Sequence, residues 1–201
     1  MAPLTMSNFM PDFTGKLLYN GRFKLVRLLG AGGGGVVYLA TDHRAPTSSS
    51  DTSPSQRAIK IVRKADGQAL EYQKREIAIH RIVSDVPHVL PLHYAWEDDE
   101  YLYISMEYCE TDLYRAIFER QAYWGNDELV RSVFLQILDA VQGCHERSVY
   151  HRDLKPENIL CNAEGTEAYV SDFGLATANR YSSTFCCGSL PYLGPGKSHG
   201  I

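Results

Sequence analysis

The sequence predicts an α+β fold in which a strand-rich region precedes a mainly helical one. Segments rich in β-branched and aromatic residues recur between residues 22 and 108. The clearest amphipathic helical pattern follows at 126–145. With 201 residues, of which 44% are hydrophobic, the chain is long enough for one large domain or two small lobes.

The strand-rich region begins with two segments on either side of a glycine cluster. RFKLVRLLG (22–30) and VVYLAT (36–41) are strand-like, and the glycines between them indicate a hairpin. RAIKIV (57–62) predicts another strand, whereas the Ser/Thr/Pro-rich residues 43–56 indicate a surface insertion. Two further strands are expected within 92–108, joined across the acidic turn EDDE.

Apolar residues at helical spacing predict two helices. The first covers 71–83, with Ile79, Ile82 and Val83 available for one face. The second runs from a cap at Asn126 to about His145. Short strands are expected near 159–161 and at 168–171, bracketing a turn.

Bulk composition excludes several classes of protein. The net charge of −4 argues against a general binder of nucleic acid or anionic membranes, and no apolar run approaches the roughly 20 residues of a membrane span. Residues 1–20 lack a signal-peptide pattern and are expected to be a poorly ordered leader. Five cysteines without CxxC spacing fit a reducing interior. Because no targeting signal is evident, the expected location is intracellular, in cytoplasm or nucleus.

The glycine cluster is a candidate phosphate-binding loop. Gly30, Gly32 and Gly35 fit the pattern GxGxxG. Because glycine lacks a Cβ, such a loop can close over phosphates and offer them backbone N–H groups. The pattern alone is weak, and a flexible turn explains it equally well. The strand-like segment that follows disfavours a dinucleotide site, which needs a helix there.

Two charged residues after this loop have two interpretations. Lys60 lies in the middle of the 57–62 strand, and Glu76 lies on the first helix. Each alone is typical of a solvated side chain. Together they could form an ion pair that directs the ammonium group at a phosphate.

The stretch HRDLKPENIL (151–160) concentrates polar groups beside a proline. Asp153 can accept or orient a hydroxyl proton, Lys155 can neutralise a transferring phosphoryl group, and Asn158 offers a carbonyl oxygen to Mg²⁺. Asp172, in SDFG, offers a carboxylate to the same cation. Phosphoryl transfer depends on positioning and charge neutralisation, which these groups could supply. A solvated loop is the alternative.

Taken together, these segments resemble the eukaryotic-type serine/threonine protein kinase family. GAGGGGVV, AIK, Glu76, HRDLKPEN and DFG occur in the family's order and approximate spacing, over roughly residues 22–196. The resemblance implies a two-lobe, protein-kinase-like fold. A small lobe over 21–107 is expected to hold a five-stranded antiparallel sheet and one helix, and 108–201 a mainly helical large lobe that is C-terminally incomplete.

The resemblance also implies ATP and Mg²⁺ as cofactors, protein substrates with a serine or threonine acceptor, and no nucleic-acid or membrane partner. Its catalytic residues are Asp153, Lys155, Lys60 and Glu76, with Lys60 paired to Glu76 on the ATP phosphates. Its metal ligands are Asn158 and Asp172. Its nucleotide-binding residues are Gly30, Ala31, Gly32, Gly33, Gly34, Gly35, Val37, Ala58, Lys60, Met106, Glu107 and Cys109.

Other residues have supporting roles under the same resemblance. His151 is expected to pack beneath Phe173, and Arg152 to meet a phosphate on the activation segment. Thr184 resembles a position phosphorylated by an activating kinase, although a plain loop threonine is an equal alternative. Cys186 and Cys187 are interpreted as ordinary loop thiols.

The C-terminal stretch departs from the family pattern. Gly194-Pro195-Gly196 stands where relatives have Ala-Pro-Glu, and the remaining helices of the large lobe have no counterpart. Without them, several large apolar side chains of the 127–145 helix face water, each forfeiting about 1.5–3 kcal/mol. Four functions remain open: a truncated kinase, a catalytically silent nucleotide-binding module, a degenerate product, and a small-molecule kinase, which LKPEN and GSLPY disfavour.

Overall fold

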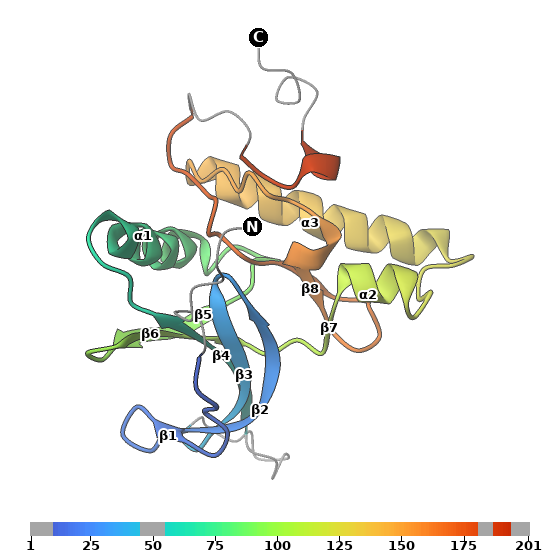
Figure 1. Cartoon of the computed structure of the whole chain (residues 1–201). Coiled ribbons are helices and arrows are strands. Elements are labelled where there is room, and N and C mark those ends of the chain that lie inside the picture. Colours follow the sequence, from blue (N-terminus) through green and yellow to red (C-terminus); the bar gives the residue numbers. More distant parts are fainter. Residues whose placement is uncertain (1–9, 45–54, 181–186, 194–201) are drawn as a thin grey trace, which may run out of the picture. The chain divides into compact units, whose positions relative to one another are not determined.

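The computed structural model describes residues 10–44, 55–180 and 187–193 (Figure 1). The chain divides into two compact units. The first comprises Met1–Ala65 and His93–Tyr108, and the second comprises Asp66–Leu92 and Cys109–Ile201. The predicted α+β class is confirmed, because the first unit is built on a sheet and the second carries the helices.

The large sheet has six strands rather than the five predicted. Neighbouring strands follow the order β1-β2-β3-β4-β6-β5 (Figure 1). The additional strand, β1, is only two residues long, which is too short for an alternating pattern to reveal it. The strands are β1 (Leu17–Leu18), β2 (Phe23–Gly32), β3 (Gly35–Asp42), β4 (Ser55–Arg63), β5 (Leu92–Glu97) and β6 (Tyr101–Glu107).

Phe13, which precedes the first strand, is fully buried in the core of the first unit. Its ring meets Tyr38 and Tyr101 edge-on, with centroids 6.0 and 5.3 Å away. Its backbone N–H donates to the Tyr38 hydroxyl, which in turn donates to Asp12. The prediction of a poorly ordered leader is therefore wrong for residues 10–20, while 1–9 lie outside the described residues.

Aromatic contacts join the two edges of the sheet. Tyr19 and Phe23, beside β1 and on β2, lie 4.9 and 5.6 Å from the ring of Trp96 on β5. The Arg22 guanidinium covers Tyr94 on the same strand at 4.1 Å and forms a bidentate hydrogen bond with Asp42. The sheet is therefore strongly curled, and its apolar face is enclosed by its own side chains.

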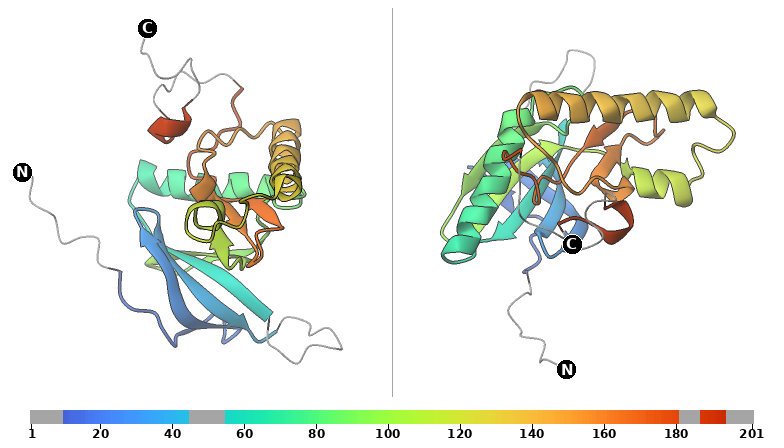
Figure 2. Two further views of the ribbon diagram at one scale, coloured as in Figure 1. Left: turned by 90° about the vertical axis from the view of Figure 1, so that its right-hand side faces the viewer. Right: turned by 90° about the horizontal axis from the view of Figure 1, so that it is seen from above.

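The second unit contains three α-helices and a small sheet, which Figure 2 shows from two further directions. The two predicted helices and the strands near 159 and 168 are confirmed, whereas α2 and β7 were not predicted. The elements are α1 (Gln68–Val83), α2 (Leu113–Phe118), α3 (Asp127–Glu146), β7 (Thr111–Asp112), β8 (Ile159–Cys161), β9 (Ala168–Val170) and two 3₁₀ turns, η2 (Pro156–Asn158) and η3 (Leu190–Tyr192).

The longest helix, α3, begins at the predicted cap. The Asn126 side chain accepts a hydrogen bond from the backbone N–H of Leu129 at 3.0 Å. One face of the helix is buried through Val133, Ala140 and Cys144. At Gly143 a Cβ would lie 2.4 Å from a methyl group of Val86, so the glycine permits close packing there.

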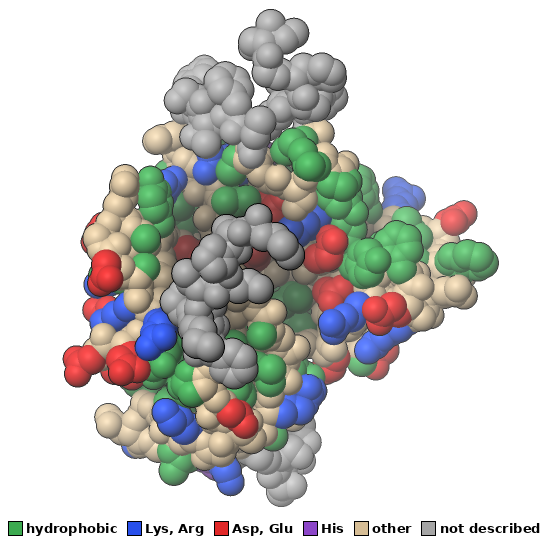
Figure 3. Space-filling view, in the orientation of Figure 1, with side chains coloured by type: hydrophobic (Ala, Val, Ile, Leu, Met, Phe, Trp, Pro, Cys, Tyr) green, Lys and Arg blue, Asp and Glu red, His purple; other side chains and the backbone are tan. Residues whose placement is uncertain are grey.

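The other face of α3 leaves large apolar side chains in water. The most exposed is Phe134, at 59%. Apolar side chains also gather over the region of α2 and α3 in Figure 3. The expected exposure of this helix is thus present, and the residues concerned are Val130, Phe134, Leu135 and Leu138.

Helix α1 belongs to the second unit, which differs from the predicted lobe boundaries. Residues 66–92, which the sequence assigned to the small lobe, group with 109–201. Packing explains the difference, because Ile79 and Val83 are buried in one cluster with Val170 and Phe173. Over the part of the chain that the structure describes, no helix is long and apolar enough to cross a membrane.

Candidate active site

Three side chains in the second unit form a closed polar cluster around Asp153. One carboxylate oxygen lies 2.9 Å from the Lys155 ammonium group. The other accepts a hydrogen bond of 2.7 Å from the backbone N–H of Ser189. Lys155 also donates to the Ser189 hydroxyl at 2.8 Å. The aspartate and lysine predicted to act in catalysis are therefore in contact.

Ser189 was not predicted as a site residue. It reaches Asp153 because Gly188 adopts a φ of 116°, and a Cβ there would stand 2.6 Å from the Arg152 carbonyl oxygen. Only glycine fits this close approach. The sequence signal was a glycine directly before a serine in GSLPY, but the stretch was interpreted only as part of the family pattern.

Asn158, a predicted metal ligand, is buried at the end of the 3₁₀ turn η2. Its amide nitrogen donates to the backbone carbonyl of Asp153 at 2.9 Å and to its carboxylate at 3.2 Å. Its backbone carbonyl accepts from the Ser171 N–H and hydroxyl, both at 2.9 Å. Because the amide nitrogen donates to Asp153, the amide oxygen is turned away from that carboxylate.

The contact between Asp153 and Lys155 favours the charged form of both side chains. Burial raises the pKa of the Asp153 carboxyl, but hydrogen bonds from Lys155 and Ser189 lower it more, so the pKa lies below its ordinary value. The hydrogen bond to Asp153 raises the pKa of Lys155. Both groups are consequently charged at neutral pH.

His151 is a buried support of this loop. Its Nε2 lies 2.8 Å from the Ser171 carbonyl oxygen and its Nδ1 3.3 Å from the Asp153 backbone nitrogen, so Nε2 donates and Nδ1 accepts. Burial lowers the pKa of His151, which keeps the ring neutral. The ring lies 5.0 Å from that of Phe173, which confirms the predicted packing.

Arg152 bonds to the chain that follows Phe173. Its Nε donates to the Leu175 carbonyl oxygen at 2.7 Å. Its predicted contact with a phosphate on the activation segment stays a prediction. Thr184 and Cys186 lie outside the described residues, as does Gly194-Pro195-Gly196, and Cys187 is a free thiol.

Two carboxylates flank Gly174. A Cβ on this glycine would lie 3.2 Å from an oxygen of Asp172 and 3.4 Å from an oxygen of Glu76 on α1. Asp172 is exposed and has a φ of 62°, a left-handed conformation uncommon outside glycine. Its carboxylate and the Asn158 amide oxygen are oxygen donors of the kind that Mg²⁺ prefers.

The two predicted metal ligands are one carboxylate and one amide. Among residues 10–44, 55–180 and 187–193, no three or more His, Cys, Asp and Glu side chains form a group that could hold a metal ion. A magnesium ion bound by one carboxylate, one amide and substrate oxygens requires no such group. The donor set therefore fits the predicted cation.

In the first unit, the glycine hairpin lies over Lys60. Gly32 pairs with Gly35, so the turn consists of Gly33 and Gly34. A Cβ at Gly34 would lie 3.6 Å from the Lys60 ammonium nitrogen. Gly35 has a φ of 110°, and a Cβ there would stand 2.3 Å from the Ile61 carbonyl oxygen. The structure thus brings the glycine loop and the predicted phosphate-binding lysine together.

All but one of the remaining predicted nucleotide-binding residues lie on neighbouring strands. Gly30 and Ala31 on β2 pair with Val37 and Val36 on β3. Ala58 on β4 pairs with Met106 on β6. Glu107 is the last residue of β6, and Cys109 belongs to the second unit. The pairing of Lys60 with Glu76, which lie in different units, stays a prediction.

A curled antiparallel sheet with a glycine hairpin, and a helical unit with an aspartate–lysine–asparagine loop, define a kinase-like class of protein. Residues 23–197 match the family model of the protein kinase domain. The chain therefore belongs to the protein kinase family.

Three relatives illustrate the similarity. The negative regulator of sexual conjugation and meiosis of Schizosaccharomyces pombe is 42% identical over 176 residues, covering 86% of this chain and 36% of that protein. Serine/threonine-protein kinase ksp1 of the same yeast is 36% identical over 189 residues, covering 90% and 38%. NUAK family SNF1-like kinase 2 of Homo sapiens is 40% identical over 145 residues, covering 69% and 22%. The chain spans little more than a third of the first two proteins.

Proposed function

We propose that the chain is an ATP-dependent protein serine/threonine kinase. The observation that carries this proposal is the polar cluster of Asp153, Lys155 and Asn158, completed by the backbone N–H and hydroxyl of Ser189. This cluster offers an acceptor for a hydroxyl proton and a cation beside it. Family membership and the names of its relatives, which include serine/threonine-protein kinases, support the substrate class.

In the proposed reaction, the oxygen of a serine or threonine hydroxyl forms a bond to the γ-phosphorus of ATP. The bond from that phosphorus to the bridging oxygen of the β-phosphate breaks, and ADP leaves. The Asp153 carboxylate, ionised because of its low pKa, orients the hydroxyl and takes its proton. Lys155 neutralises charge on the transferring phosphoryl group.

The glycine hairpin and Lys60 have the chemistry to hold the ATP phosphates. Backbone N–H groups of residues 30–35 would surround the phosphates, and the Lys60 ammonium, beside Gly34, would neutralise the α- and β-phosphates. Asn158 and Asp172 would hold Mg²⁺, which neutralises phosphate charge when bound. Glu76 would orient Lys60, and the backbone from Glu107 to Cys109 would meet the adenine ring.

A second candidate function is a nucleotide-binding module that transfers no phosphate. The exposed apolar face of α3 and the Gly-Pro-Gly stretch in place of Ala-Pro-Glu favour it, because both weaken support for the catalytic unit. Regulation by an activating kinase at Thr184 belongs to the first candidate function.

Replacing Asp153 with Asn separates the two functions. The amide keeps the shape of the carboxylate but cannot take the proton, so phosphate transfer from γ-labelled ATP to a serine/threonine substrate should fall about 100-fold or more. ATP affinity, measured by calorimetry, should stay within about threefold. Asp139→Asn, at an exposed position on α3, is the matched control and should retain full activity.

Three outcomes are informative. Transfer that survives Asp153→Asn contradicts the role given to Asp153. A wild-type chain that binds ATP but transfers no phosphate supports the silent module. A chain that neither binds ATP nor transfers phosphate contradicts both functions.

A further inference from the structure

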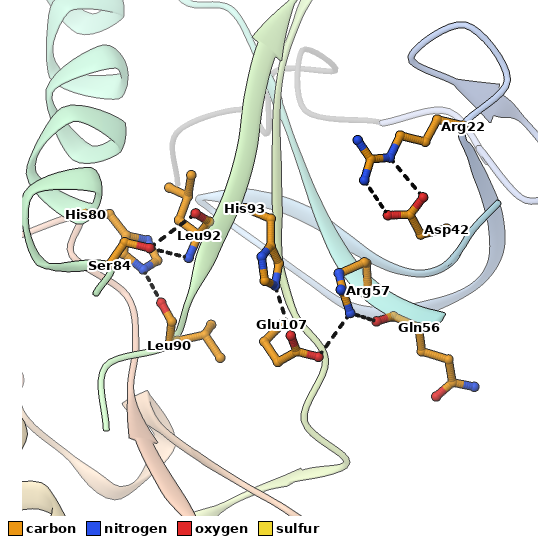
Figure 4. A network of polar contacts seen from close by, with 10 residues as sticks. All are labelled: Arg22, Asp42, Gln56, Arg57, His80, Ser84, Leu90, Leu92, His93 and Glu107. Atoms are coloured by element: carbon orange, nitrogen blue, oxygen red, sulfur yellow. Dashed lines mark hydrogen bonds and ion pairs between the residues drawn. The ribbon is translucent and has the colours of Figure 1, made fainter. Parts of the chain in front are cut away.

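A polar network links three strands at one end of the sheet in the first unit (Figure 4). Nε2 of His93, on β5, lies 2.9 Å from one carboxylate oxygen of Glu107, on β6. Nη1 of Arg57, on β4, donates to the other oxygen at 3.2 Å and to the Gln56 carbonyl oxygen at 2.7 Å. Each oxygen of Glu107 therefore has a different cationic or hydrogen-bonding partner.

These partners lower the pKa of the Glu107 carboxyl group. The hydrogen bond to His93 lowers the pKa of Glu107, burial raises it, and the Arg57 charge and a hydrogen bond with the Tyr108 backbone N–H lower it further, so that the pKa lies below its ordinary value. The two largest contacts come from side chains on neighbouring strands, and both end on the last residue of β6.

Glu107 occupies the position where the main chain leaves the sheet. It pairs with Arg57 at the end of the β4–β6 ladder, next to the pair of Ala58 with Met106. The next residue, Tyr108, lies outside any strand. The hydrogen bonds to the Glu107 side chain therefore restrain the chain at the point where the β4–β6 ladder ends.

We propose that His93 and Arg57 are positioning residues that fix the main chain at Glu107 and Tyr108 for nucleotide binding, by clamping the Glu107 carboxylate. The inference rests on the proposed function, because it requires that this main-chain segment contacts the base. Neither His93 nor Arg57 needs to touch the nucleotide. Their effect is on the conformation available to bind it, and therefore on affinity rather than on the chemical step.

A simple surface ion pair is the competing explanation. The His93 side chain is 28% exposed and that of Glu107 38% exposed, and exposed ion pairs often contribute little to stability. The two explanations differ in what they predict. A surface pair predicts no change in nucleotide affinity when His93 is replaced, whereas the clamp predicts weaker binding with unchanged turnover.

The test replaces His93 in the full chain and measures the KM and directly titrated Kd for Mg·ATP. His93→Ala removes a hydrogen bond to a charged group, and we expect both constants to rise about three- to tenfold while kcat stays constant. His93→Gln keeps an N–H donor at similar reach and should restore both constants. His43→Ala, at an exposed position after β3, is the matched control and should match wild type.

The outcomes separate this inference from the proposed function. Wild-type Kd in His93→Ala overturns the clamp even if the chain is an active kinase. A raised Kd supports the clamp even if the chain transfers no phosphate. If the wild-type chain does not bind ATP at all, both the clamp and the proposed function are wrong.

Discussion

The two units of this kinase-family chain bury their apolar side chains to different degrees. In the first unit, Phe13 and the rings at both edges of the sheet enclose the core, and Phe13 itself is fully buried. In the second unit, α3 buries one face and leaves Phe134 59% exposed on the other. The difference indicates that a sheet which curls can complete its core locally, whereas a long helix depends on partners for each of its faces.

The largest expected effect tests the closed core. Phe13→Ala removes a fully buried ring from a site that adjoins Tyr38 and Tyr101, and it should lower the free energy of unfolding by about 3–5 kcal/mol. Chemical denaturation followed by fluorescence measures this change. Phe13→Leu is the conservative control and should recover much of the loss. A cost below about 1 kcal/mol would show that the N-terminal segment is not part of the core.

An intermediate effect tests the ion pair between Arg22 and Asp42 in the first unit. Asp42→Asn leaves Arg22, whose side chain is only 14% exposed, without its charged partner, and it should cost about 2–4 kcal/mol. Burial raises the pKa of Asp42, but hydrogen bonds from Arg22 and the Arg44 backbone lower it below its ordinary value. The carboxylate therefore stabilises the fold above its unfolded pKa of about 4, and this contribution is lost as pH falls through the folded pKa.

Urea unfolding at pH 7 and at successively lower pH checks the prediction for Asp42. The difference between wild type and Asp42→Asn should be largest near neutrality and should shrink in acid. A difference that does not change down to about pH 2 would mean that the carboxylate charge has no role.

The smallest expected effect tests the open face of α3. Phe134→Glu places a charge where the side chain is already in water, so the free energy of unfolding should change by no more than about 0.5 kcal/mol. Val133→Glu, one residue earlier and 3% exposed, is the matched control and should abolish folding of the second unit. A cost of several kcal/mol at Phe134 would reveal that this face is covered in solution.

The fold was largely predictable because its main elements carry regular patterns. Alternating residues in β3 and β4, the acidic turn before Tyr101 and the Asn126 cap each specify local structure that does not depend on distant contacts. Asp98 accepts hydrogen bonds from the backbone N–H groups of Glu100 and Tyr101, which explains the EDDE turn.

The features that were missed depend on tertiary contacts. Phe13 stands in an irregular segment, MPDFTGK, and only the ring contacts with Tyr38 and Tyr101 give it a place in the core. Ser189 reaches Asp153 only through the backbone conformation of Gly188. No periodicity in the sequence encodes contacts of this kind, since they join segments far apart in the chain.

The glycine hairpin has a consequence for anyone who redesigns it. Gly30, Gly32 and Gly33 have open space where a side chain would begin, and Gly34 allows ordinary van der Waals contact. Gly35 alone combines a left-handed backbone with a collision against the Ile61 carbonyl oxygen. In a library that randomises these five positions, the fold should accept other residues at the first four glycines. Gly35 should be retained in every variant that folds.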